Sequence, residues 1–302
     1  MVNPYEVGYL VGGAKKDNFD KVDPASFSNH SRPLIVDVGS AQGRFLIQLA
    51  QRHSENGTSP YNYVGFELRS GLVNAANEAV QSSNIKGSVL FLQGDAKTNM
   101  LQSLAPVVPN TTHVDTTTGA TNAEPSTTTP SAHVEWLTIQ FPDPWTKKKH
   151  HKRRLVDPIF VAECATLISN RQGKVYICSD RYDLASFMYD TFAASELWRP
   201  LLEYAPGDGD YHKSTGSAAA VPVATPTTAD ASTDSALEKD DEEEEEELAF
   251  GADVYREKDL NDTRFWLPQR PFPVGTERDS VAEKKNRPVH RAIFVRVFPT
   301  EV

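Results

Sequence analysis

The chain has 302 residues, of which 39% are apolar and 24% are charged, which is the size of one large or two ordinary domains. Its formal net charge is −10, but nine acidic residues and one lysine at positions 238–247 account for most of it, so the remainder is nearly neutral. The sequence has no apolar run long enough for a membrane-spanning helix, and its two cysteines lack CxxC spacing, which excludes a disulfide framework and a cysteine zinc site.

Short apolar runs alternate along the chain with segments of helical periodicity. Continuous apolar strands that alternate with helices are typical of a parallel sheet covered on both faces. We therefore expect an α/β fold with a doubly wound, mostly parallel sheet and a C-terminal antiparallel strand. The predicted strands are 34–38, 63–67, 88–92, 134–141, 174–178 and 289–298, and the predicted helices are 43–52, 71–81, 158–169 and 184–194.

Two segments have a composition unlike that of the rest. Residues 106–132 are rich in threonine and proline, and residues 206–247 are rich in small residues and end in the acidic tract. Neither offers enough apolar area to offset chain entropy, so both are predicted to be disordered insertions into one domain that spans 1–302. The acidic tract is interpreted as a solvated linker; a mimic of nucleic acid that covers a basic cluster is the alternative.

Carboxylates lie at or just after the carboxyl ends of three of the predicted strands, where an open α/β sheet binds its ligands. They are Asp37, Glu67 and Asp95. The loop after Asp37 lacks both the dinucleotide fingerprint and the P-loop lysine, which favours an adenosyl ligand without a pyrophosphate. In this interpretation Gly39 and Gly43 allow close approach of the backbone, Asp37 faces a cationic amino-acid end, Glu67 binds the ribose and Asp95 the adenine amino group. The alternative for each single carboxylate is a helix N-cap.

The segment 140–154 carries the most specific pattern. Two prolines flank Asp143, Trp145 follows, and residues 147–154 read KKKHHKRR. A fixed carboxylate, an aromatic ring and a cluster of cations suit a nucleic-acid substrate whose base enters the site. A nuclear localisation signal or a solvated surface is the alternative for the basic run, and the adjacent histidines lack a third metal ligand. The cations expected on the RNA backbone are Lys148, Lys149, Lys152, Arg153 and Arg154.

Taken together, these motifs resemble the tRNA (guanine-N7-)-methyltransferases of the bacterial, cyanobacterial and plastid-like type. The resemblance rests on DVGSAQGRFLIQLA, GFELRSGLV, GDA, IQFPDPWTKKKHHKRRLVDP, SD, PFPVGTERD and RPVHRAIF. It implies a class I, Rossmann-like fold, S-adenosyl-L-methionine as the cofactor and methylation of N7 of guanosine 46 in the variable loop of tRNA. The chain has Ser40 and Ala41 where the family commonly has a second glycine or a cysteine.

The resemblance also assigns residues. It implies that Asp37, Glu67, Asp95 and Asp143 contact the cofactor and that Asp143 is catalytic. The implied substrate contacts are Lys147, Asp180, Thr276, Glu277, Arg278 and Asp279.

The expected chemistry needs no general base, because guanine N7 carries a lone pair and no proton. A small-molecule methyltransferase and a catalytically silent tRNA-binding module are the alternatives; the basic run disfavours the first and the carboxylates disfavour the second. We expect tRNA as the partner, no membrane, and a monomer or homodimer, with no accessory subunit indicated. The first 20 residues show no secretory signal, so an intracellular location is expected, in the cytosol or a plastid, with the nucleus as an alternative.

Overall fold

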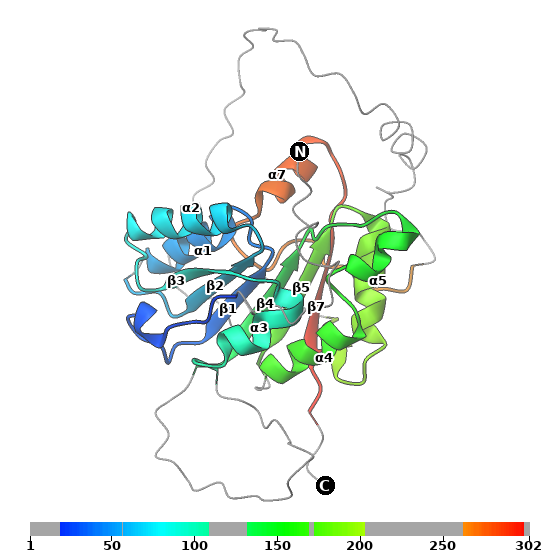
Figure 1. The fold of residues 1–302 in the computed structure, drawn as a ribbon. Helices are drawn as coiled ribbons and strands as arrows, with labels where there is room; N and C mark the ends of the chain where they lie inside the picture. Colours follow the sequence, from blue (N-terminus) through cyan, green and yellow to red (C-terminus); the bar gives the residue numbers. More distant parts are fainter. Residues whose placement is uncertain (1–18, 56, 109–131, 169–171, 203–261, 299–302) are drawn as a thin grey trace, which may run out of the picture.

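A computed structural model describes residues 19–55, 57–108, 132–168, 172–202 and 262–298. It contains a seven-stranded sheet in the order β3-β2-β1-β4-β5-β7-β6 (Figure 1). Strands β1 to β5 are parallel, whereas β7 runs antiparallel to both β5 and β6. The mostly parallel sheet with an antiparallel C-terminal strand is confirmed. The strands are β1 Leu34–Val38, β2 Asn62–Glu67, β3 Val89–Gln93, β4 Val134–Gln140, β5 Lys174–Ser179, β6 Trp198–Pro200 and β7 His290–Arg296.

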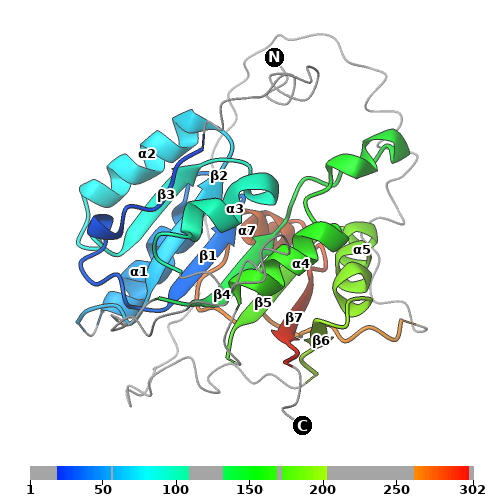
Figure 2. The ribbon, with the colours of Figure 1, turned by 60° about the horizontal axis from the view of Figure 1, so that its bottom comes forward.

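Helices cover both faces of the sheet. One core lies under α1 and α2, and a second lies under α3, α4 and α5, which pack side by side (Figure 2). The apolar side chains of the central strands alternate between these two cores, because successive residues of a strand point to opposite faces. The helices are α1 Arg44–Ser54, α2 Ser70–Gln81, α3 Ala96–Leu104, α4 Pro158–Leu167, α5 Tyr182–Ala193 and α7 Glu277–Lys284, with 3₁₀ turns η1 Pro24–Ser26 and η2 Lys148–Arg153.

Residues 267–273, here called the proline segment, form no helix or strand and cover the sheet on the same face as α1. The ring of Phe272 is buried and makes edge contacts with Phe45, Trp136 and Tyr176, at centroid distances of 5.4, 5.0 and 5.8 Å. The backbone N–H of Leu267 donates to the carbonyl of Arg291 at 2.7 Å. The contacts of Phe272 with Trp136 and Tyr176 therefore hold the proline segment over β4 and β5.

The structure contains two helices, two 3₁₀ turns and one strand that the sequence analysis does not predict. They are α3, α7, η1, η2 and β6, while the predicted helices and strands are present within three residues of their expected bounds. The first predicted insertion is narrower than expected, because Val107, Val108 and Ala132 are buried. Residues 109–131 and 203–261, which hold the rest of both predicted insertions, lie outside the described residues. Within the described ranges no helix has the length and apolar character to cross a bilayer.

The strand order indicates at which end of the sheet a ligand would bind. Strand β1 is followed in the chain by β2 and β3 on one side, and β4 and β5 lie on its other side. Ligands of doubly wound sheets bind at the carboxyl ends of the strands, where the order reverses. The residues after β1, β2, β3, β4 and β5 are therefore the candidates for function.

Candidate active site

The loop between β1 and α1 turns sharply across the end of β2. Gly39, Ala41 and Gly43 have φ values of 80°, 48° and 73°, all in the left-handed region. The backbone N–H groups of Gly39 and Ser40 both donate to the carbonyl of Phe66, at 2.9 and 2.8 Å. These two bonds fix the backbone of the loop against β2, so a ligand would meet a backbone of defined conformation.

The two glycines of this loop serve different purposes. A Cβ on Gly39 would meet no atom within 4 Å, whereas one on Gly43 would lie 2.4 Å from the Phe91 ring and 3.0 Å from the Ala76 Cβ. Glycine is thus required at 43 for packing against the sheet and α2, and its predicted role in close approach to a ligand stays a prediction. The open space beside Gly39 is compatible with the same role there.

Asp37 is a buried carboxylate at the carboxyl end of β1. Its side chain is 4% exposed and accepts hydrogen bonds at Oδ1 from Thr138 Oγ1 at 2.5 Å and Gln140 Nε2 at 3.3 Å. Burial raises the pKa of Asp37 to about 6, against the lowering effect of these two bonds. No donor among the described residues contacts Oδ2. Sequence analysis missed Thr138 and Gln140, although two polar residues at alternate positions of an apolar strand were a visible sign.

Glu67 and Asp95 organise the loops that follow β2 and β3. Glu67 accepts from the backbone N–H of Ala41 at 3.1 Å and from the N–H and Nε of Arg69, both at 3.0 Å. Asp95 caps α3 by accepting from the N–H of Lys97 at 3.0 Å, which is the N-cap alternative for this residue. Asp37 and Glu67 thus lie at the carboxyl ends of β1 and β2, and Asp95 lies just after β3. These three strands are adjacent in the sheet.

These features fit an adenosyl cofactor with a cationic amino-acid end. The Ser40 hydroxyl is buried and, within the described chain, has no hydrogen-bond partner. Open space lies beside Gly39, and Asp37 Oδ2 can accept from a cation. A pyrophosphate would be repelled by the three carboxylates, whereas a sulfonium would not.

Strand β4 leads into a rigid loop that carries Asp143. The backbone N–H of Phe141 still donates to the carbonyl of Cys178 at 2.9 Å, so the loop begins on the sheet. Phe141 and Trp145, on either side of the Pro-Asp-Pro sequence, have φ values of 48° and 43°. Such left-handed backbone costs about 1–3 kcal/mol for a residue other than glycine and clusters at functional sites. The exposed Asp143 side chain is therefore presented by a constrained backbone.

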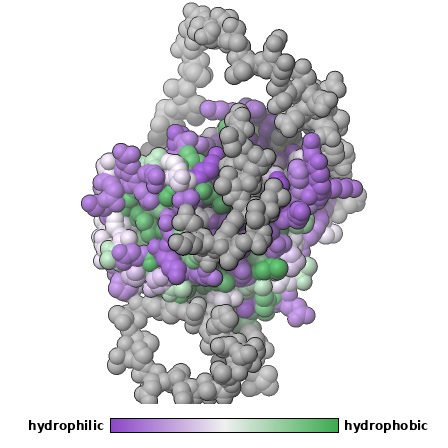
Figure 3. All heavy atoms as spheres, viewed as in Figure 1, coloured by the Kyte–Doolittle hydropathy of each residue, from purple (hydrophilic) through white to green (hydrophobic). Residues whose placement is uncertain are grey.

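The basic turn, defined as residues 147–153, projects from this loop away from the sheet (green in Figure 2). The Trp145 ring contacts His150 edge-on at a centroid distance of 5.7 Å, and the Arg153 guanidinium lies 5.0 Å from its centroid. Hydrophilic side chains dominate this edge of the molecule (Figure 3). Five cations of the turn are exposed: Lys147, Lys148, Lys149, Lys152 and Arg153.

Arg154 does not belong to this exposed group. Its exposure is 7%, and its Nε donates to the carbonyl of Pro144 at 3.1 Å. The prediction that Arg154 contacts the RNA backbone is therefore not supported, because its guanidinium is directed into the protein.

The start of α7 supplies the remaining predicted residues. Thr276 and Asp279 form a capping box: the Thr276 Oγ1 accepts from the N–H of Asp279, and the Asp279 carboxylate accepts from the N–H of Thr276 at 2.8 Å. Asp279 is buried, and its other oxygen accepts from Arg291 at 3.0 Å. The structure thus gives Thr276 and Asp279 a structural role at the start of α7, and their predicted contact with the substrate stays a prediction.

Two other predicted substrate residues are brought together here. Buried Asp180, after β5, forms an ion pair with Arg278 at 2.9 Å and a longer one with Arg287 at 3.6 Å. Glu277 forms an ion pair with Arg44 at the start of α1. Helix α7 therefore connects the ends of β5 and β1, although the sequence alone did not indicate a helix here.

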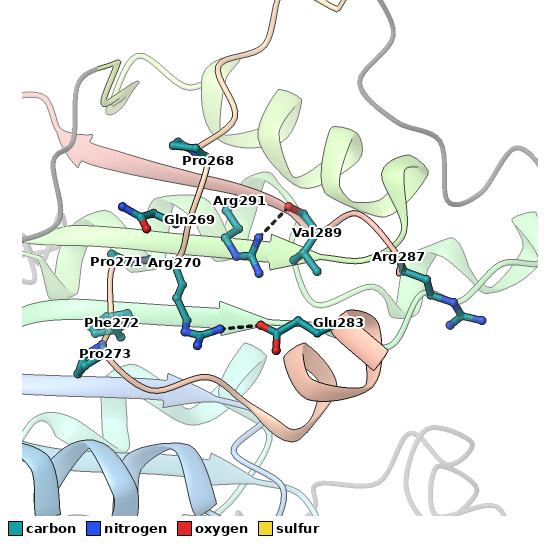
Figure 4. A pocket seen from close by; sticks show the side chains of 10 residues that line it. All are labelled: Pro268, Gln269, Arg270, Pro271, Phe272, Pro273, Glu283, Arg287, Val289 and Arg291. Atoms are coloured by element: carbon teal, nitrogen blue, oxygen red, sulfur yellow. Dashed lines mark hydrogen bonds and ion pairs between the residues drawn. The ribbon is translucent and has the colours of Figure 1, made fainter. Parts of the chain in front are cut away.

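A pocket of about 670 Å³ lies beside α7, between the proline segment and the start of β7 (Figure 4). Arg270 points across it to Glu283 at 3.0 Å, and Arg291 donates to the Val289 carbonyl at 3.1 Å. None of the predicted cofactor residues lines it. The lining residues are Pro268, Gln269, Arg270, Pro271, Phe272, Pro273, Glu283, Arg287, Val289 and Arg291.

Comparisons with known proteins agree with this arrangement. A family model described as putative methyltransferase matches residues 31–111 and 122–211, more than half of the chain. A tRNA (guanine-N(7)-)-methyltransferase of Trichormus variabilis is 27% identical over 98% of this chain and 94% of that protein. Another, of Prochlorococcus marinus, is 31% identical over 61% of this chain and 77% of that protein.

Solved structures add no weight to these matches. A SAM-dependent methyltransferase of Thiobacillus denitrificans in complex with S-adenosyl-L-homocysteine aligns with a TM-score of 0.28 and 14% identity, over 49% of this chain and 42% of that one. The family therefore rests on the sequence matches, which confirm the resemblance found in the motifs. By these matches and by its fold, the chain belongs to the tRNA (guanine-N7-)-methyltransferase family.

Proposed function

We propose that this protein transfers the methyl group of S-adenosyl-L-methionine to N7 of guanosine 46 in the variable loop of tRNA. The observation that carries the proposal is the arrangement at one sheet edge: carboxylates at the ends of β1 and β2, the constrained Asp143 loop after β4, and the exposed cations directly beyond it. The carboxylates suit the cofactor, the Asp143 loop suits the base, and the exposed cations suit the RNA backbone. The matched relatives are named tRNA (guanine-N(7)-)-methyltransferases, which supports the class of reaction and of substrate.

S-adenosyl-L-methionine supplies a methyl group already activated by the sulfonium. The chain would hold it with Asp37 at the cationic amino-acid end, Glu67 at the ribose and Asp95 at the adenine. Gly39 leaves room for the ligand, and the Ser40 hydroxyl offers an unused donor. These residues bind and orient the cofactor and take no part in proton transfer.

Replacing Glu67 with alanine should weaken cofactor binding by about 1.5–3 kcal/mol, which is typical for a hydrogen bond to a charged group. Titration calorimetry on the folded variant measures this. The exposed Glu78, on α2, gives the matched control, since Glu78→Ala removes the same charge from a helix surface. Unchanged affinity in Glu67→Ala, with the melting temperature retained, would contradict the assignment.

Cofactor affinity should depend on pH through Asp37. Its folded-state pKa of about 6 exceeds the ordinary value of 3.8, so in the free protein it is neutral below about pH 6 and ionised above. A cationic ligand favours the ionised form, so affinity should rise with pH by up to about tenfold per unit and level off above pH 6. The free energy of unfolding should fall over the interval from pH 4 to 6, because the folded state holds the proton more tightly.

Calorimetry between pH 5 and 8 tests this dependence. Asp37→Asn should abolish it, because the amide has no proton to release in this range. A wild-type affinity that is flat across the interval would show that Asp37 does not face the cationic end.

Guanine N7 is a nucleophile without a proton, so the protein needs to orient it and not to deprotonate it. Asp143 would accept hydrogen bonds from the N1 and N2 edge of the base, or stabilise the positive charge that develops on the ring. The exposed cations of the basic turn would hold the phosphates on either side. Orientation of this kind supplies much of the barrier reduction in a transfer between two bound groups.

The test is to incubate the purified chain alone with S-adenosyl-L-methionine and bulk tRNA and then to map N7-methylguanosine. Modification at guanosine 46 without any added subunit is expected. Methylation at another nucleotide would overturn the position, and methylation only with an added protein would overturn autonomous action. Transfer to small molecules but not to tRNA would overturn the substrate class.

A further inference from the structure

Arg154 is the last of the six cations in residues 147–154, yet its surroundings are those of a core residue. It is 7% exposed, whereas its neighbours Lys152 and Arg153 are exposed. A guanidinium that contacts RNA phosphates has to reach solvent, so burial separates Arg154 from the group that its sequence position suggests.

Its guanidinium contacts the backbone of the loop that carries Asp143. Nε donates to the carbonyl of Pro144 at 3.1 Å, Nη2 lies 3.3 Å from Nε2 of His151, and the planar group stacks on the Phe187 ring of α5 at 4.7 Å. The Pro144 carbonyl is part of the Pro144–Trp145 peptide, and Trp145 has a φ of 43°. The bond therefore fixes a peptide plane at the strained end of the loop.

The backbone of Arg154 is held from the other side. Its carbonyl accepts from Lys97 Nζ at 2.8 Å, and the same ammonium pairs with Asp157 at 2.7 Å. The backbone N–H of Lys97 donates to Asp95, at the start of α3. Arg154 thus lies between the Asp143 loop and the helix that begins at a candidate cofactor residue.

We propose that Arg154 is a positioning residue: it holds the Pro144–Trp145 peptide in place, so that Asp143 is presented to the base, and it makes no contact with RNA phosphates. The role in catalysis rests on the proposed function. Displacement of a reacting group by about 1 Å can cost up to roughly 100-fold in rate, so the loss of this bond has a measurable consequence.

The experiment compares Arg154→Lys with Arg199→Lys, at an exposed arginine of β6, in the full chain. Lysine preserves the charge that a phosphate needs, but it lacks the planar fork that bonds the carbonyl and stacks on a ring. Arg154→Lys should therefore lose about 10- to 100-fold in single-turnover rate at saturating tRNA, with tRNA affinity and its salt dependence retained. Arg199→Lys should keep both the rate and the affinity. A normal rate in Arg154→Lys would overturn the proposal.

Two further measurements do not depend on activity. Hydrogen exchange of residues 141–147 should be faster in Arg154→Lys than in the wild type and unchanged in Arg199→Lys. Serine variants should differ in the salt slope of tRNA binding: Arg153→Ser should lower it by about 0.7–0.9 and Arg154→Ser should leave it unchanged. A lowered slope in Arg154→Ser, or unchanged exchange in Arg154→Lys, would overturn the inference. A wild type that forms no N7-methylguanosine would overturn the proposed function alone, since these two measurements still decide the role of Arg154.

Discussion

Asp143→Asn is expected to lower the rate of methyl transfer about 100-fold, which corresponds to about 2.7 kcal/mol of barrier. The amide retains the size of the side chain and part of its hydrogen bonding, but it removes the charge that faces the developing cation. The loop should keep its shape, because the flanking prolines and the bond from Arg154 to the Pro144 carbonyl remain in the variant. Single-turnover kinetics at saturating tRNA and cofactor measure the chemical step directly.

The pH profile separates the electrostatic role from that of a general base. The wild-type rate should be level through neutrality, because no side chain has to accept a proton from N7. Affinity for tRNA should change little in Asp143→Asn. Glu55→Gln, an exposed carboxylate near the end of α1, is the matched control and should retain full activity. A near-normal rate in Asp143→Asn would leave this residue as a structural part of the turn.

Replacing Lys148, Lys149, Lys152 and Arg153 with serine should weaken tRNA binding strongly and make it less sensitive to salt. Each cation on a phosphate contributes roughly 0.7–0.9 to the slope of log affinity against log salt, so four should lower the slope by about 3. Cofactor affinity should be retained, because these side chains are exposed beyond the sheet edge. Filter binding or fluorescence anisotropy over a range of salt concentrations measures both quantities.

The control for this variant removes the same charge elsewhere. Lys21, Arg52, Lys86 and Arg199 are exposed outside the basic turn, and their replacement with serine should leave the slope nearly unchanged. An equal reduction in both variants would mean that only the overall charge matters. No reduction in either would mean that the basic turn is a localisation signal or a solvated surface.

The order of strands and the carboxylates of the site could be predicted because each depends on local pattern. The strands before Asp37 and Glu67 are continuous apolar runs, and a parallel sheet brings their ends to one edge. Helix α7 escaped prediction because its sequence, ERDSVAEK, has no apolar periodicity, and its position depends on ion pairs made by Arg278 and Glu277 with distant residues. Its T-x-x-D capping box was the one local sign of it.

The role of Arg154 could not be predicted for a different reason. Within KKKHHKRR the sequence does not distinguish an outward cation from an inward one, because the direction of each side chain depends on the 3₁₀ turn and on Phe187 from a later helix. The same holds for Gly43, where the need for glycine comes from Phe91 on β3. Features set by contacts between distant segments are visible only once the chain is folded.

The place of β7 in the sheet has a consequence for synthesis on the ribosome. Among the described residues β6 pairs only with β7, and β7 also pairs with β5, so within this part of the chain residues 198–200 gain their strand partner when residues 290–296 have emerged. At roughly 5–20 residues per second, translation of the intervening residues 201–289 takes about 5–20 s. During that time the described part of the chain offers no strand for the side of β5 that β7 later covers, and an unpaired strand edge favours pairing with other chains. Completion of this sheet is therefore one of the last events in the making of the protein.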